Sequence, residues 1–133
     1  MDNWNALLLP VRFVAARSAR ESDIVVDVIG SLPQQTDEFS RDHAAVTSLT
    51  YHASGAIIRA RVVLAVAAPD GRRYPLADQQ GTLLHELGHA IGLAHASGTS
   101  AVMAPTRSTR AITGVDIALA RAHYAACRSP GGT

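Results

Sequence analysis

The chain has 133 residues, of which 47% are hydrophobic and 17% are charged. We therefore expect residues 1–133 to form one globular domain with a modest core. Twelve basic and eleven acidic residues leave a formal net charge of +1, which gives no electrostatic reason to expect a nucleic acid or an anionic membrane as a partner. The single cysteine excludes an intrachain disulfide. No stretch approaches the ~20 apolar residues of a membrane span, and the first residues lack the pattern of a signal peptide.

The first half of the chain predicts strands. Residues 11–16 and 24–29 are short runs rich in β-branched side chains, and two further runs, 45–51 and 56–67, follow after a polar loop. The last two runs are joined by a segment that ends at Gly55, and glycine suits a hairpin turn because it tolerates a positive φ. Four strands are therefore predicted.

The second half predicts two helices separated by an irregular loop. The first helix runs over residues 78–91, with Asp78 as its N-cap and Gly92 just past its end. Residues 98–113 show little periodicity, and residues 113–127 form the last helix. Four strands, a helix, a loop and a helix predict an α+β domain in which one sheet packs against helices.

The segment from His85 to His95 carries the pattern His-Glu-x-x-His-x-x-Gly-x-x-His. On a helix, His85 and His89 lie about 40° apart and one turn from each other, so both imidazoles can reach one metal ion. Leu84 and Leu87 fall on the opposite side, where they can anchor the helix to the core. One helix can thus hold two metal ligands rigidly.

Glu86 lies ~100° around the helix from His85, beside the metal rather than on it. Its carboxylate can take a proton from water during attack on a carbonyl and return that proton to the leaving amine. Gly92 ends the helix and turns the chain, so that His95 can become the third ligand. Three histidines with one open position are typical of a catalytic zinc site, because structural sites have four protein ligands.

This pattern is the zinc signature of the metzincins, and the chain resembles that clan in a second feature. Metzincins add a methionine turn below the metal, and Met103, in the segment 100–105, lies eight residues after His95. The resemblance implies that Met103 forms an apolar floor under the zinc ion without ligating it. The short interval between the third histidine and the methionine is similar to that of the matrixins, the branch of the matrix metalloproteinase catalytic domains.

Three other segments resemble matrixins. Residues 113–117 lead to Tyr124 in the last helix, Trp4 resembles the end of the family's first helix, which is largely missing here, and residues 22–26 resemble the start of a strand. The resemblance implies a zincin-like fold, with a twisted mixed sheet that has an antiparallel edge strand, an active-site helix and a C-terminal helix. It also implies a secreted, monomeric zinc endopeptidase, of bacterial type, whose peptide or protein substrate pairs with the edge strand, here expected within residues 60–67.

The chain also departs from the matrixin pattern. Matrixins usually bind calcium and a second zinc ion through a Gly- and Asp-rich loop, which residues 55–78 do not provide, so we predict one zinc ion and leave calcium undecided. Where animal matrixins place a pocket tyrosine, this chain has Pro105 and Arg107, which we predict to contribute to the substrate pocket. Arg107 either makes that pocket shallower or more polar, or is a solvated loop residue. Asp116 either holds the methionine turn or provides a helix N-terminal charge.

Two rival interpretations have different chemistry. Metal-dependent endoribonucleases of the YbeY type, which mature bacterial ribosomal RNA, carry a similar motif of three histidines. They lack a glutamate after the first histidine and have an aspartate before the last, whereas this chain has Glu86 and Ala94 at these positions. The other rival is a catalytically inactive zinc-binding domain, which would most readily have lost Glu86. The intact glutamate favours the peptidase.

Overall fold

The computed structural model describes residues 2–32, 44–106 and 108–126. Its elements, in chain order, are α1 (Asp2–Asn5), β1 (Ile24–Ile29), β2 (Ala45–Tyr51), β3 (Ile57–Ala65), α2 (Leu76–Ala90) and α3 (Gly114–Ala126). The sheet is mixed: β1 pairs with β3 in parallel, and β2 pairs with β3 in antiparallel orientation. The α+β class and the mixed sheet with an antiparallel edge strand are therefore confirmed.

The position of the edge strand differs from the prediction. We expected the edge strand within residues 60–67, but these residues belong mostly to β3, which lies in the centre of the strand order β1-β3-β2. The alternate side chains of Ala60, Val62 and Leu64 are buried, and such an apolar strand gains most from a neighbour on each side. The antiparallel edge strand of the described sheet is β2.

The predicted strand at residues 11–16 is also wrong. The side-chain amide of Asn5 brackets the backbone of Phe13: Asn5 Nδ2 donates to the Phe13 carbonyl over 2.9 Å, and the Phe13 N–H donates to Asn5 Oδ1 over 2.8 Å. At Phe13, a side chain thus satisfies the backbone N–H and carbonyl that a neighbouring strand would otherwise have paired. The run of β-branched residues did not indicate this contact, because Asn5 lies outside it.

The remaining boundaries are close to those predicted. β1 and β2 have the predicted bounds, whereas β3 is shorter at both ends. Helix α2 begins at Leu76 instead of Asp78 and has Pro75 at its N-cap. Asp78 was therefore wrong as the N-cap; it lies in the first turn and forms an ion pair with Arg110. The end of the last predicted helix, beyond residue 126, lies outside the described residues.

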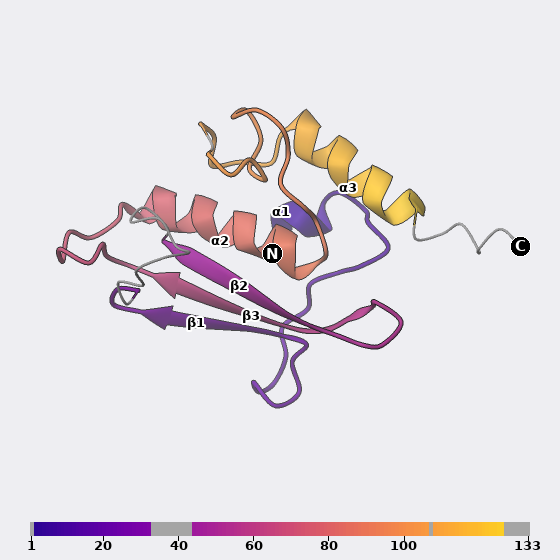
Figure 1. The fold of residues 1–133 in the computed structure, drawn as a ribbon, viewed down its shortest axis with the longest axis horizontal. Helices are drawn as coiled ribbons and strands as arrows, with labels where there is room; N and C mark the ends of the chain where they lie inside the picture. The colour runs from indigo at the N-terminus through magenta and orange to yellow at the C-terminus, as the bar shows by residue number, and fades with distance from the viewer. Residues whose placement is uncertain (1, 33–43, 107, 127–133) are drawn as a thin grey trace, which may run out of the picture.

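Helix α2 separates the two parts of the core. It packs against β2 and β3 on one side, and α1 and α3 lie on its side away from the sheet (Figure 1). That second side contains the buried cluster of Trp4, Leu84, Leu87, Leu93, Ala96, Ala101, Val102, Met103, Ala104 and Ala120. The Trp4 indole N–H donates to the carbonyl of Leu84 over 2.9 Å and so ties α1 to α2. In the part of the chain that the structure describes, no helix is long and apolar enough to cross a membrane.

Candidate metal centre and active site

Helix α2 brings His85 and His89 to one site. Leu84 and Leu87 are buried in the core cluster, so they fix the rotation of the helix about its axis. His85 is buried and His89 is half-buried. The two rings lie 4.6 Å apart between centroids, with Nε2 atoms 3.0 Å apart.

A backbone reversal at the end of α2 delivers the third histidine. Gly92 has φ +93°, and its N–H donates to the carbonyl of His89, while the Leu93 N–H donates to that of Gly88, over 2.9 and 3.0 Å. This pair of bonds is a Schellman motif, which requires a left-handed residue and so favours glycine. The chain turns back, and the exposed His95 places its Nε2 3.2 Å from that of His89.

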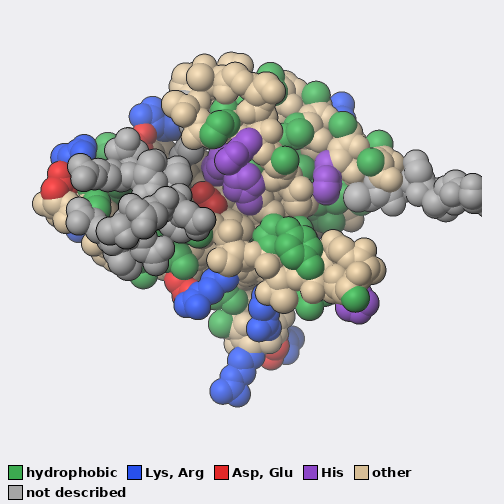
Figure 2. Space-filling view, viewed as in Figure 1, with side chains coloured by type: hydrophobic (Ala, Val, Ile, Leu, Met, Phe, Trp, Pro, Cys, Tyr) green, Lys and Arg blue, Asp and Glu red, His purple; other side chains and the backbone are tan. Residues whose placement is uncertain are grey.

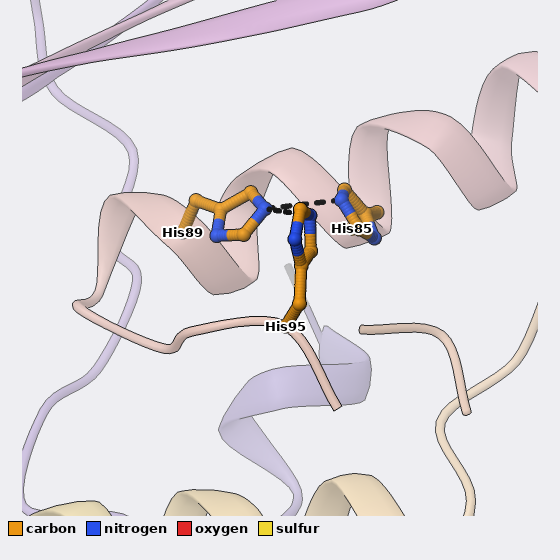
Figure 3. Close-up of side chains that lie close together, drawn as sticks. All are labelled: His85, His89 and His95. Atoms are coloured by element: carbon orange, nitrogen blue, oxygen red, sulfur yellow. Dashed lines mark hydrogen bonds between the residues drawn. The ribbon is translucent and has the colours of Figure 1, made fainter. Parts of the chain in front are cut away.

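Backbone carbonyls determine which nitrogen of two rings faces the shared centre. His85 Nδ1 donates to the carbonyl of Val102 over 2.6 Å, and His89 Nδ1 donates to that of Leu93 over 2.7 Å. Because a carbonyl only accepts, each Nδ1 carries the proton, and each Nε2 presents a lone pair to the centre. Figure 3 shows the rings of His85, His89 and His95 converging, the first two from α2 and the third from the following loop.

This donor set fits a zinc ion. The three histidines offer ligand atoms that all lie within 4.8 Å of one another. A tetrahedral zinc ion with Zn–N bonds of 2.0–2.1 Å would require nitrogens about 3.3 Å apart, close to the observed 3.0 and 3.2 Å. Two lone pairs at this distance repel each other unless a cation lies between them. The arrangement can therefore hold one metal ion, and Glu86 is not a member of this ligand group among the described residues.

Met103, in the predicted methionine turn, packs against the helix that carries His85 and His89. Its side chain is fully buried and packs against Gly88 of α2. A Cβ on Gly88 would lie 2.2 Å from Met103 Sδ and 3.1 Å from the Trp4 ring, so only glycine permits this approach. The Ala96 N–H donates to the Met103 carbonyl over 2.9 Å, which links the turn to the segment that carries His95.

Asp116 holds the turn from α3. Its fully buried carboxylate accepts the N–H groups of Val102 and Met103 over 3.0 and 2.8 Å. It also accepts the backbone N–H and the hydroxyl of Thr113 at the start of α3, over 2.8 and 2.9 Å. Both interpretations considered for this residue therefore describe the same carboxylate, which caps α3 and fixes the turn. Since the Val102 carbonyl orients His85, Asp116 also acts on the metal centre.

Glu86 has a partner that the sequence did not suggest. Its side chain is 7% exposed, and its Oε2 accepts the hydroxyl of Thr47, on β2, over 2.5 Å. The same hydroxyl lies 3.3 Å from the backbone carbonyl of Glu86. The sequence hinted at this contact only in that Thr47 is a polar residue on the side of β2 that faces α2.

Of the two predicted pocket residues, the structure describes only Pro105. Pro105 is exposed, and Arg107 lies outside the described residues. A pocket of about 440 Å³ opens one turn before Glu86, between α2 and the loop after the methionine turn. Among the described residues, Pro105 is not part of its wall, which is formed by Ala44, Tyr74, Asp78, Thr82, Ser108, Thr109 and Arg110.

The metal centre is accessible from solvent. Histidine side chains form a cluster in the middle of the face drawn in Figure 2, over the region where α2 and the following loop lie in Figure 1. Of the three histidines, His95 is exposed to solvent, whereas His89 is half-buried and His85 is buried.

Comparison with protein families agrees with this geometry. The model of the matrixin family, which contains zinc-dependent metallopeptidases, matches residues 2–124. No curated protein gives a significant match to the chain. The family match covers α1, the sheet, α2, all but the last two residues of α3, and the three histidines. The chain therefore belongs to the matrixin family.

Proposed function

We propose that this chain is a zinc-dependent endopeptidase in which His85, His89 and His95 bind one catalytic zinc ion and Glu86 is the general base. The observation that carries the proposal is the convergence of three Nε2 atoms, two of them on rings oriented by backbone carbonyls. Three protein ligands leave a coordination position for water or substrate, as in catalytic zinc sites. Zinc bound here would polarise the scissile carbonyl and make a water molecule more acidic.

Glu86 would move the proton in this reaction. It directly follows a metal ligand in the sequence, but it is not a member of the ligand group. Its buried position keeps the carboxylate away from bulk water, and its backbone belongs to the rigid helix that carries two of the ligands. We propose that it accepts a proton from the attacking water and delivers it to the leaving amine.

The substrate is proposed to be an extended peptide. β2 is an edge strand of the described sheet and packs against α2, so its outer edge can pair with a peptide backbone next to the metal centre. The adjacent 440 Å³ pocket would receive one substrate side chain, with Thr82 and Arg110 in its wall. We further propose that the chain acts outside the cell, as a monomer, on proteins or peptides.

The test is peptide cleavage by the zinc-loaded chain. We expect cleavage of a peptide library or casein, loss of activity with a zinc chelator, recovery with added zinc, and one zinc ion per chain by metal analysis. Glu86→Gln should lower kcat/KM by about 10²–10⁴-fold, the usual contribution of a general base, with zinc still bound. Glu21→Gln, at an exposed glutamate, is the matched control and should cleave like wild type.

Two outcomes would overturn the proposal. Full activity of Glu86→Gln would mean that another group is the base. A folded, zinc-loaded chain that cleaves no peptide of the library would favour the inactive zinc-binding domain, or the endoribonuclease if it cleaves RNA.

A further inference from the structure

We infer that Thr47 is a positioning residue for Glu86, whose carboxylate it orients through a hydrogen bond from the neighbouring strand. The inference rests on the proposed function, because it concerns the group assigned as the base. Thr47 is half-buried in β2 and alternates with the exposed Ser48. Its side chain therefore lies on the side of the strand that faces α2.

The contact is short and directed to the carboxylate. The Thr47 hydroxyl lies 2.5 Å from Glu86 Oε2 but 3.3 Å from the Glu86 backbone carbonyl. A hydroxyl has one proton to donate, and bonds to a charged acceptor are the shorter and stronger ones. The hydroxyl proton therefore goes to the carboxylate oxygen rather than to the backbone carbonyl.

This bond limits what the glutamate side chain can do. Glutamate has three rotatable side-chain bonds, and a general base must lie about 2.6–3.2 Å from the proton that it takes. A bond from β2 to Oε2 holds one oxygen of the carboxylate, so Oε1 is the oxygen left to receive the proton from water. The base is then held from two elements, by its backbone on α2 and by its carboxylate on β2.

β2 is also the strand to which we assign the substrate. A peptide paired with its outer edge would bind to the same strand that orients the base. Thr47 would thus link substrate binding to the position of Glu86. The methyl group of Thr47 has no part in this link, so serine should replace threonine and valine should not.

The experiment compares Thr47→Val, Thr47→Ser and Thr99→Val in the full, zinc-loaded chain, with wild type and Glu86→Gln in the same series. Thr99 is an exposed threonine outside β2 and is the matched control. Thr47→Val should lower kcat about 10- to 100-fold, as expected for loss of a hydrogen bond to a charged group, with KM within about twofold of wild type. Thr47→Ser should stay within about threefold of wild type in both constants, and Thr99→Val should be unchanged.

A second measurement does not depend on activity. In the metal-free protein, thermal unfolding of Thr47→Val, Glu86→Gln and the double variant forms a mutant cycle. If the two side chains act as a pair, the double variant loses less in Tm than the sum of the single losses. Additive losses would mean that the two side chains are not coupled and would overturn the inference.

The remaining outcomes separate the two proposals. If wild type cleaves peptides, Glu86→Gln does not, and Thr47→Val keeps the wild-type kcat, the role of Thr47 is wrong and the proposed function stands. If Thr47→Ser loses as much kcat as Thr47→Val, packing rather than the hydroxyl is responsible, and the inference again fails. If wild type is inactive or Glu86→Gln fully active, the proposed function fails first.

Discussion

The two parts of the metal centre are built in different ways. His85 and His89 come from consecutive turns of one helix, so their proximity follows from helical geometry. His95 comes from an irregular segment, which is held by a backbone hydrogen bond from Ala96 to Met103 and, through the methionine turn, by Asp116 of α3. The helical part therefore needs little support, whereas the loop part depends on a buried carboxylate and on close packing. Substitutions at the residues that hold the loop test how much the position of His95 depends on each of them.

The largest effect is expected at Asp116. Asp116→Asn replaces one acceptor oxygen with a donor that faces N–H groups, so buried donors of the turn lose their partner. We expect a loss of roughly 3 kcal/mol in the free energy of unfolding, measured by denaturant titration of the metal-free chain. Zinc affinity should fall about tenfold or more, because the turn also orients His85 through the Val102 carbonyl.

The control is Asp70→Asn, at an exposed aspartate that accepts one backbone N–H, that of Arg72. It should change stability by less than about 0.5 kcal/mol. Similar losses for both variants would mean that the buried carboxylate has no special role in supporting the loop part.

A smaller effect is expected at Gly88, where the two parts meet. In Gly88→Ala, the new Cβ would overlap Met103 Sδ, and the fully buried methionine has little room to move. Overpacking of this kind costs about 1–3 kcal/mol, which a thermal shift should detect. Gly114→Ala, with nothing within 4 Å of its Cβ position, should be unchanged or slightly more stable. A neutral Gly88→Ala would show that the close approach of turn and helix is dispensable.

The smallest effect is expected at Arg110, which tests whether surface charge also holds the loop. The ion pair between Arg110 and Asp78 is largely exposed, so Arg110→Gln should cost less than about 1 kcal/mol, and the loss should shrink with added salt. Arg121→Gln, at an exposed arginine of α3, is the control. If Arg110→Gln lost as much free energy of unfolding as Asp116→Asn, the surface ion pair would support the loop as strongly as the buried carboxylate, contrary to our expectation.

Local sequence alone determined much of this protein. The spacing of the histidines predicted one metal centre, because a helix repeats every 3.6 residues, and the glycine after α2 predicted the reversal that brings back His95. Short runs rich in β-branched residues predicted β1 and β2 with their bounds. These features depend on neighbours within a few residues, so a sequence pattern records them.

Only the tertiary structure decided the rest, because the responsible contacts join residues far apart in the chain. The side chain of Asn5 bonds to the backbone of Phe13, within residues 11–16, which lie outside the described sheet, and the pairing order makes β2 rather than β3 the edge strand. The hydroxyl of Thr47 reaches Glu86 across 39 positions of sequence. No periodicity marks such a pair, since it arises only when a strand and a helix pack together.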